Sequence, residues 1–469
     1  MKAVFFGGGS HRYLGIGRSA LAQPGLFAGG ELYLYDLNVP RAEAVGQMIM
    51  KAPEYAAANC RVRWGSNLDE ALEGADAVMV VMMAGTRANH GVCELICREH
   101  GFLGSDQLSP SGAMLALKGG PTLMSLARLM EQVCPNAWLV DFANPVAVLS
   151  AAVNNHTKIR CLGVCGGYTN HQWDLTRLLY GQDAPHSDYE IRCAGVNHMS
   201  FILPGSRHQG RDLYELAAER VNDQWTMAPL SDRWDAGSKA NITNSVTTLE
   251  RLYRKFGYLV FSTEGDGLAH LDIERTHPPV DPTEIAAGKA RLAENAARGD
   301  AGRAAADAEF NSWLTRVTPA DWDRESPETL HLLRCDEDIM VKVLKALGGC
   351  GDMAIATSFP TGGAVRGFKD RTVLEYSQVL GQDGLRPVPD LEVPDVFQGL
   401  VSALATHQTL LGDAIGTRDP KILFEALYSY PVKQDTADSK VLWRDLLAAA
   451  AEEIPAEFQE TRAYFANRP

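Results

Sequence analysis

The chain opens with the apolar run Ala3-Val4-Phe5-Phe6, which leads directly into Gly7-Gly8-Gly9-Ser10-His11. An apolar strand followed by a glycine-rich turn is typical of the first unit of a dinucleotide-binding fold. Glycine is favoured there because a backbone without a Cβ can turn tightly and approach a pyrophosphate. Gly7 and Gly9 fit the G-x-G-x-x-G spacing and Ser10 follows them, whereas the third glycine, Gly15, comes too late. We expect Gly15–Ala28 to form a helix whose first N–H groups face the phosphates.

Four more apolar segments follow in the first part of the chain, and each is consistent with a short buried strand. They are Glu31–Asp36, Ala77–Met83, Ala137–Asp141 and Arg160–Val164. Leu123–Val133 carries apolar residues at helical spacing between two of them. Strands that alternate with helices need crossover connections, which give a mostly parallel sheet with helices on both faces. The sequence therefore predicts a Rossmann-like, doubly wound α/β fold.

The pattern changes after about residue 185, which predicts a second lobe of mixed α/β structure. We expect Tyr189–Val196 and Ser200–Pro204 to pair as antiparallel strands. We expect 282–318 to be an exposed helix, because it holds almost no large apolar residues. Other expected elements are helices over 212–222, 239–256 and 443–452, and strands over 353–358 and 372–376. The expected domains are a dinucleotide-binding domain over 1–190 and a substrate-binding and oligomerisation domain over 191–469.

The overall composition narrows the class of protein. The 469 residues carry a formal net charge of −14, which disfavours binding to nucleic acid or to an anionic membrane surface. The longest clean apolar run, Ala77–Ala84, is far too short to span a bilayer, and no signal peptide is recognisable at Met1. The nine cysteines form no C-x-x-C pair, so a reducing, cytoplasmic compartment is expected.

Two residues bear on which dinucleotide would bind. Asp36 ends the second expected strand, where an acidic side chain can accept hydrogen bonds from an adenosine ribose. Because that carboxylate would repel a 2′-phosphate, the sequence favours NAD over NADP. Arg87 follows the strand expected over 77–83 and is either a contact at the cofactor's edge or a surface charge.

Three short motifs carry a family resemblance. Asn144-Pro145-Val146 follows a strand, at the sheet edge where ligands bind in such folds, although Asn144 could instead cap a helix. This motif resembles two related NAD-dependent groups, the lactate and malate dehydrogenases and the glycoside hydrolases of family four. Gly163-Val164-Cys165 and Gly195-Val196-Asn197-His198 resemble elements of the second group. The dehydrogenases also need a Gly-x-His-Gly histidine in the second lobe, whereas the His-Gly of this chain, His90-Gly91, lies in the first.

The resemblance implies a metal- and NAD-dependent glycosidase. Cys165 and His198 would hold a divalent cation; a thiolate and an imidazole favour Zn, Fe, Co or Ni by softness, whereas the resemblance implies manganese. Asn144, Asn197 and Lys118 would contact the sugar. The implied reaction oxidises the sugar at C3 with NAD, removes the C2 proton, eliminates the aglycone, adds water and returns the hydride. The resemblance also implies dimers or tetramers.

The acid and base of this reaction do not follow from the family pattern. The residue after the metal-binding cysteine is commonly His, Asp or Asn in the family, but here it is Gly166, which carries no proton. Tyr168 and His171 are the nearby candidates for the acid. The stretch 262–272, which matches the segment holding the family's tyrosine base, has no tyrosine, so His270 and Asp266 are the candidates for the base.

Two other functions stay open at the level of sequence. The first is an NAD-dependent sugar or hydroxy-acid oxidoreductase on the same fold, which the departures at Gly166 and in 262–272 favour. The second is a non-catalytic protein that binds or senses NAD. A glycosidase would release aglycone without net NADH, a dehydrogenase would accumulate NADH, and a sensor would do neither.

Overall fold

An eleven-stranded sheet forms the centre of the protein in this computed structural model, which describes residues 1–83, 85–182, 187–231, 234–262, 265–271, 281–326, 329–431 and 436–466. Its strand order is β3-β2-β1-β4-β5-β6-β12-β13-β8-β9, and β14 pairs with β13. The strands are β1 (Lys2–Phe6), β2 (Glu31–Tyr35), β3 (Arg61–Gly65), β4 (Ala77–Val80), β5 (Trp138–Asp141), β6 (Arg160–Gly163), β8 (Cys193–Val196), β9 (Met199–Ile202), β12 (Met353–Pro360), β13 (Val373–Gly381) and β14 (Gly384–Pro387).

The first half of this sheet confirms the predicted fold. Strands β1 to β6 are parallel and follow the order 3-2-1-4-5-6 of doubly wound dinucleotide-binding sheets. Five of them were expected from the sequence. The sixth, β3, was not, because it lies at the sheet edge and alternates exposed Arg61 and Arg63 with Val62 and Trp64 instead of forming an apolar run.

The second half of the sheet is antiparallel and continues directly from the first. Strand β12 meets β6 where Ser358 pairs with Gly163, and β13 connects β12 to the hairpin of β8 and β9. The expected antiparallel pair is thus confirmed, with Val196 opposite Met199 at the hairpin end. A separate sheet joins β7 (Tyr189–Glu190), β10 (Arg207–His208) and β11 (Arg211–Asp212). Because one sheet runs through both halves, the division at residue 190 stays a prediction.

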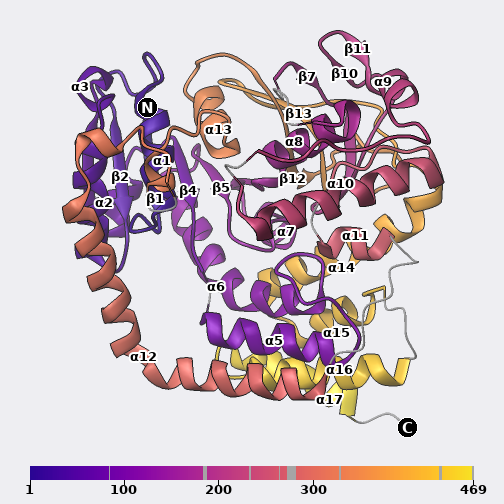
Figure 1. The fold of residues 1–469 in the computed structure, drawn as a ribbon. Coiled ribbons are helices and arrows are strands. Elements are labelled where there is room, and N and C mark those ends of the chain that lie inside the picture. Colours follow the sequence, from indigo (N-terminus) through magenta and orange to yellow (C-terminus); the bar gives the residue numbers. More distant parts are fainter. Residues whose placement is uncertain are drawn as a thin grey trace.

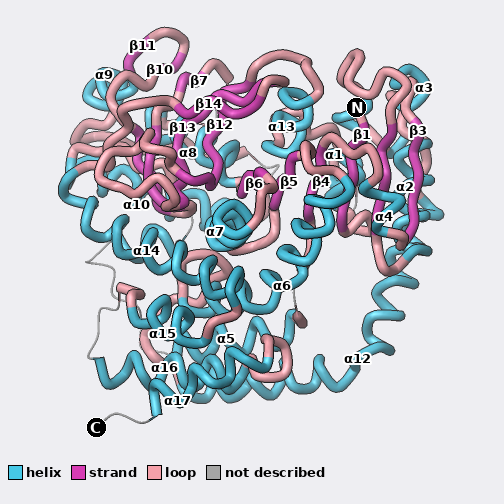
Figure 2. The backbone as a smooth tube through the Cα atoms, turned by 180° about the vertical axis from the view of Figure 1, so that it is seen from behind, coloured by secondary structure: helices cyan, strands magenta, loops and turns pink. Residues whose placement is uncertain are grey.

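Helices cover both faces of the sheet, with α1 and α13 on one side and α6 and α7 on the other (Figures 1 and 2). Below the sheet, α5, α6 and α14 to α17 form a helical layer (Figure 1). The helices are α1 (Arg12–Leu21), α2 (Val39–Met50), α3 (Tyr55–Ala58), α4 (Leu68–Leu72), α5 (Arg87–Glu99), α6 (Pro110–Val133), α7 (Val146–His156), α8 (Gly167–Tyr180), α9 (Leu213–Arg220), α10 (Ala236–Phe256), α11 (Gly265–Leu271), α12 (Pro282–Arg316), α13 (Ile339–Leu347), α14 (Asp395–Thr417), α15 (Pro420–Tyr428), α16 (Thr436–Ala449) and α17 (Thr461–Ala466).

Two helices differ from what the sequence predicts. The first helix begins at Arg12, directly after the glycine turn, and ends at Leu21 because Pro24 and Gly25, which has a φ of +77°, stop it well before residue 28. The long helix α12 is mostly exposed, as expected, but it bends at Gly299 (φ +42°) into two halves. The first half lies along α5 and the second along α2 (Figure 1).

Two further properties concern the whole described chain. All nine cysteines are free thiols, in agreement with the expected absence of a disulfide framework. Among the helices of the described residues, none has both the length and the apolar composition that crossing a bilayer requires.

Candidate active site

The glycine-rich turn has the geometry expected of a phosphate-binding turn. Gly7 has a φ of +81°, and a Cβ on it would lie 1.9 Å from the carbonyl oxygen of Val81, so only glycine fits. The N–H groups of Gly7 and Gly8 both donate to the carbonyl oxygen of Tyr35, which ties the turn to the end of β2. Arg12 occupies the third glycine position of the motif, and its guanidinium carbon lies over the Phe142 ring, 3.9 Å from the ring centroid.

Asp36 is held at the end of β2 by two backbone N–H groups. Gly9 donates to Oδ2 at 2.9 Å and Asn38 donates to Oδ1 at 2.8 Å. Each carboxylate oxygen accepts one hydrogen bond here and keeps capacity for another, so the carboxylate can still accept from a ligand hydroxyl.

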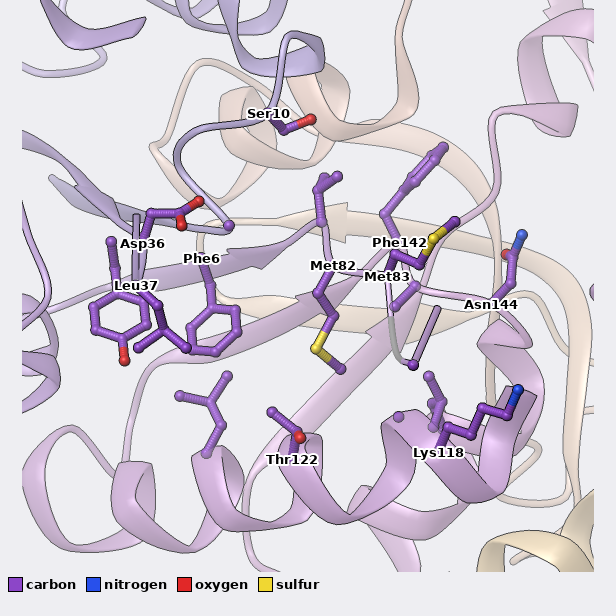
Figure 3. A pocket seen from close by; sticks show the side chains of 18 of the residues that line it. Phe6, Ser10, Asp36, Leu37, Met82, Met83, Lys118, Thr122, Phe142 and Asn144 are labelled. Atoms are coloured by element: carbon purple, nitrogen blue, oxygen red, sulfur yellow. The ribbon is translucent and has the colours of Figure 1, made fainter. Parts of the chain in front are cut away.

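A cavity of about 990 Å³ extends from the glycine-rich turn to Asn144 and Lys118. Figure 3 shows Ser10 and Asp36 on one side of it, Asn144 and Lys118 on the other, and α6 beneath. Its size suits a ligand as long as a dinucleotide. The predicted residues that line it are Gly7, Gly9, Ser10, Asp36, Arg87, Lys118 and Asn144. The structure therefore brings the predicted cofactor residues and two of the three predicted substrate residues to one cavity.

Lys118 lies in this wall as half of a buried ion pair. Its ammonium is 3.0 Å from Oε2 of Glu453, and only 1% of the Lys118 side chain is exposed. Nζ also donates to the side-chain oxygen of Asn89, and Glu453 accepts from the Thr86 hydroxyl at 2.7 Å. Burial acts to raise the pKa of Glu453, but the hydrogen bonds from Thr86 and Lys118 outweigh it and lower that pKa. Arg87, by contrast, is exposed at the start of α5.

Cys165 and His198 meet although they come from different halves of the sheet. Cys165 follows β6, and His198 lies in the turn between β8 and β9 with a φ of +67°. The thiol sulfur is 3.7 Å from Nε2 of His198 and accepts the N–H of Gly167 at 3.3 Å. Close packing against His198 requires Gly267, where a Cβ would lie 1.6 Å from the His198 carbonyl oxygen.

Asp266 fixes the orientation of the His198 ring. Its Oδ1 lies 2.9 Å from Nδ1 of His198, while Oδ2 accepts from the Ser105 hydroxyl at 2.5 Å and from the Leu108 N–H at 3.0 Å. Burial acts to raise the pKa of Asp266, but the nearby His198 and these hydrogen bonds outweigh it and lower that pKa. An imidazole whose Nδ1–H is bonded to a carboxylate presents Nε2 as the donor to a metal. The structure thus places this predicted base on His198 instead of in the cavity.

The segment 105–108, between α5 and α6, connects the Cys165–His198 pair to the cavity. Its ends, Ser105 and Leu108, hold Asp266, as described above. Its middle residues hold Asn144: Gln107 donates to Oδ1 of Asn144 at 2.6 Å, and Nδ2 of Asn144 donates to Asp106. Asn144 therefore does not cap α7, which begins at Val146. Both ends of the Asn144 carboxamide are oriented, and each keeps capacity for one more hydrogen bond.

Asn197, the third predicted substrate residue, is fully buried in the β8–β9 turn. Its Nδ2 donates to Glu375 of β13 at 2.6 Å, and the same carboxylate accepts from the Ser200 hydroxyl at 3.1 Å. The side-chain oxygen of Asn197 has no partner among the described residues. A buried oxygen in that condition requires a donor from water or a ligand.

The remaining acid and base candidates are not among the residues that line the cavity. The Tyr168 hydroxyl donates to the carbonyl oxygen of Ala354 at 3.2 Å, and burial raises its pKa. The buried His171 ring packs edge-on against Phe261. Nε2 of His270 lies 3.4 Å from the Tyr430 hydroxyl. Residues 263, 264 and 272 of the stretch 262–272 lie outside the described residues.

Space is open beside Gly166, the position at which the resemblance leads us to expect His, Asp or Asn. A Cβ built on Gly166 would meet only ordinary contacts, 3.6 Å from the Phe142 ring and 3.9 Å from the Arg12 guanidinium. The absence of a side chain is therefore not imposed by packing.

Sequence reasoning missed the residues that support this site. Two of these residues, Asp106 and Gln107, lie in segment 105–108, shortly before α6 begins at Pro110. Their adjacent polar side chains are the one local sequence feature that could have indicated a role in the site. Glu375 and Glu453 give no such signal, because each acts on a residue more than 100 positions away.

Comparison with known proteins identifies the class. The model of the family 4 glycosyl hydrolases matches residues 2–180, and that of the family 4 glycosyl hydrolase C-terminal domain matches residues 193–432. The chain therefore belongs to family 4 of the glycosyl hydrolases, as its motifs indicated, and it is a glycoside hydrolase.

Individual relatives differ in how much of the chain they match. An alpha-galacturonidase of Thermoanaerobacter italicus is 24% identical over 478 residues, covering 96% of this chain and 97% of its own. A 6-phospho-beta-glucosidase of Escherichia coli is 27% identical over 205 residues, 43% of this chain and 45% of its own. Among solved structures, a 6-phospho-alpha-glucosidase from gut microorganisms, in complex with NAD and glucose-6-phosphate, has the same fold, with a TM-score of 0.73, 19% identity and coverage of 97% and 99%.

Proposed function

We propose that the protein cleaves a glycoside with NAD and a divalent cation, manganese being the first to test. The observation that carries the proposal is the pairing of Cys165 with His198 at 3.7 Å, which segment 105–108 connects to a cavity lined by the glycine turn and Asp36. Support comes from a related 6-phospho-beta-glucosidase of Thermotoga maritima, whose structure was solved with manganese, NAD⁺ and glucose-6-phosphate and shares this fold with a TM-score of 0.70 at 16% identity.

The residues present fit both groups. A thiolate and an oriented imidazole are suitable ligands for a divalent cation, and within the described residues no cluster of three or more His, Cys, Asp or Glu offers a competing site. Asp36 would accept the ribose hydroxyls of a dinucleotide, and Gly7 lets the backbone approach the phosphates. When bound, NAD would supply a reversible hydride acceptor and the cation would polarise the sugar oxygens.

The side chains of this protein would then orient the sugar for oxidation at C3 and loss of the C2 proton. Asn144 keeps one donor and one acceptor for sugar hydroxyls, because Asp106 and Gln107 already fix its orientation. Asn197 offers its unpartnered oxygen to a hydroxyl donor. Departure of the aglycone by elimination, addition of water and reduction at C3 would complete the cycle.

The proton-transfer residues stay predictions. Asp266 is bonded to His198 and the Tyr168 hydroxyl to a backbone carbonyl, while the His171 ring is buried. Tyr168 and His171 stay the candidates for the acid, and His270 and Asp266 those for the base.

A galacturonide is the first substrate to test. The relatives that match this chain along its whole length include alpha-galacturonidases, whereas the 6-phospho-beta-glucosidase match covers less than half. Arg87, which is exposed and lines the cavity, supplies a cation for a sugar carboxylate.

Product analysis in deuterated water tests the reaction. The protein would be incubated with NAD⁺, Mn²⁺ and a panel of galacturonides, neutral glycosides and 6-phosphoglycosides. We expect aglycone release without net NADH, and deuterium at C2 of the released sugar. Release of sugar with its C2 hydrogen intact would contradict elimination, and stoichiometric NADH would instead support the oxidoreductase.

A further inference from the structure

The second half of α12 lies against the dinucleotide turn, and the contacts are specific. Asp307 of α12 accepts from Nη1 of Arg41 at 2.6 Å and from the Asn38 side chain at 2.7 Å. Phe310, one turn further along, packs on the His11 ring with centroids 4.0 Å apart. A helix from the second lobe therefore reaches the loop that follows β2.

Every guanidinium nitrogen of Arg41 is occupied in this arrangement. Nε donates to the carbonyl oxygen of Gly9 at 2.7 Å, Nη1 donates to Asp307, and Nη2 lies 3.1 Å from Nε2 of His11. Burial, with Arg41 and His331 nearby, lowers the pKa of His11 to about 4, so its neutral ring accepts this contact. The guanidinium carbon also lies over the Phe310 ring, 4.4 Å from its centroid. Asp307 is the charged group among these partners.

Arg41 lies beside Asp36, at the position that determines the preference for NAD or NADP in dinucleotide-binding folds. It lines the cavity with Asp36, and a Cβ on Gly9 would lie 2.8 Å from Cγ of Arg41 and 3.0 Å from Oδ2 of Asp36. In dinucleotide-binding folds, an acid at this position binds the ribose of NAD, whereas a nearby arginine accommodates the 2′-phosphate of NADP. This chain has both residues at the same place, so the pair of them does not by itself set the selectivity.

We propose that Asp307 determines dinucleotide selectivity by holding Arg41 away from the 2′ position of the ribose. The inference rests on the proposed function, because it requires a dinucleotide in this cavity. Two effects then disfavour NADP: the Asp36 carboxylate repels a 2′-phosphate, and Asp307 pairs with the Arg41 guanidinium, which would otherwise attract that phosphate. Asp307 is a positioning residue, since it acts on the ligand through Arg41.

The test measures the dissociation constants of NAD⁺ and NADP⁺ by calorimetry, for the wild type and for Asp36→Asn, Asp307→Asn and the double variant. Asparagine at position 36 removes the charge but keeps an oxygen for the Gly9 N–H. We expect each single variant to bind NADP⁺ only slightly more tightly than the wild type, because the other effect still acts. We expect the double variant to bind NADP⁺ about tenfold more tightly than Asp36→Asn, the gain typical of one hydrogen bond to a charged group.

Controls separate this role from general effects on α12. Glu309→Gln changes an exposed acid two residues along the same helix and should leave both affinities unchanged. Adding Arg41→Leu to the double variant should abolish the gain. Asp307→Ser serves as the second variant if Asp307→Asn does not fold. Equal NADP⁺ affinities of Asp36→Asn and the double variant would overturn this inference alone, whereas a wild type that binds no NAD⁺ would overturn the proposed function and the inference with it.

Discussion

Replacing Asp266 with asparagine should weaken metal binding at the Cys165–His198 pair. The aspartate accepts four hydrogen bonds from other residues, two on Oδ1 from His198 and the Gly267 N–H, and two on Oδ2 from Ser105 and Leu108. Asparagine has only one oxygen, so its amide group must face either the Nδ1 side of His198 or the Leu108 N–H. If it faces Leu108, a buried donor is left opposite another donor; if it faces His198, the ring loses the acceptor that fixes its tautomer.

Both the metal affinity and the stability should change measurably. Loss of a carboxylate that orients a metal-binding histidine typically weakens metal affinity about 10- to 100-fold, or about 1.4 to 2.7 kcal/mol. An unsatisfied buried donor costs about 1 to 3 kcal/mol of unfolding free energy. The assays are calorimetric titration of the apoprotein with Mn²⁺ and unfolding in urea, for the wild type and Asp266→Asn.

Ser105→Ala is the matched control, because it removes one donor to Asp266 without altering the His198 contact. It should lower the unfolding free energy by about 1 kcal/mol and leave the Mn²⁺ affinity nearly unchanged. A folded Asp266→Asn protein with the Mn²⁺ affinity of the wild type would refute the reasoning. In that case the orientation of the His198 ring would have to come from packing alone.

Three further predictions concern other groups. Glu453→Gln should cost about 3 kcal/mol of unfolding free energy in urea, because it leaves the buried Lys118 ammonium without its charge partner, whereas Glu457→Gln, at an exposed ion pair, should cost less than about 1 kcal/mol. His407 is buried, and burial lowers its pKa to about 4, whereas the pKa of an unfolded-state histidine is 6.5. Its contribution to stability is therefore complete above pH 6.5 and is lost as the pH falls towards 4, so the unfolding free energy should fall by about 2 kcal/mol between pH 7 and pH 5. The His407→Gln variant should lack that part of the pH dependence. Gly166→Asp should raise turnover of glycosides with poor leaving groups relative to activated ones, and an unchanged ratio in a folded variant would show that this position supplies no proton.

The parts of the fold that the sequence predicted are those in which a strand is buried on both faces. Segments such as Ala77–Val80 are continuous apolar runs bounded by polar residues, so both their position and their parallel arrangement can be predicted. Strand β3 escaped because an edge strand with Arg61 and Arg63 on its exposed side carries no such run. The start of α1 was misplaced because the late Gly15 was taken as the beginning of the helix, whereas the chain becomes helical as soon as the turn at Gly7 is complete.

The approach of Cys165 to His198, the proposed metal pair, was predictable for a different reason from their supporting residues. Cys165 and His198 each stand at the end of a strand within a recognisable motif, and the strand order brings those ends together. Asp307 and Glu453 belong to no motif, and they meet Arg41 and Lys118 only through the path of α12 and of the helical layer. Local patterns in a sequence do not indicate which distant acid pairs with a given buried cation, because every Asp or Glu side chain could form the same ion pair.

Segment 105–108 shows why the motifs alone do not define the site. Asn144 and His198 come from separate motifs, yet each is fixed through neighbouring residues of this one short segment, which itself matches no motif. Asn144 is bonded to Asp106 and Gln107 of the segment, whereas His198 is bonded to Asp266, which Leu108 holds in turn. Neither side chain can rotate without leaving one of these polar groups without its partner. The relative position of the Asn144 amide and the His198 imidazole is therefore set by the backbone of the segment between α5 and α6, because Asp106 and Gln107 hold Asn144 while the adjacent Leu108 N–H holds the Asp266 carboxylate that orients His198.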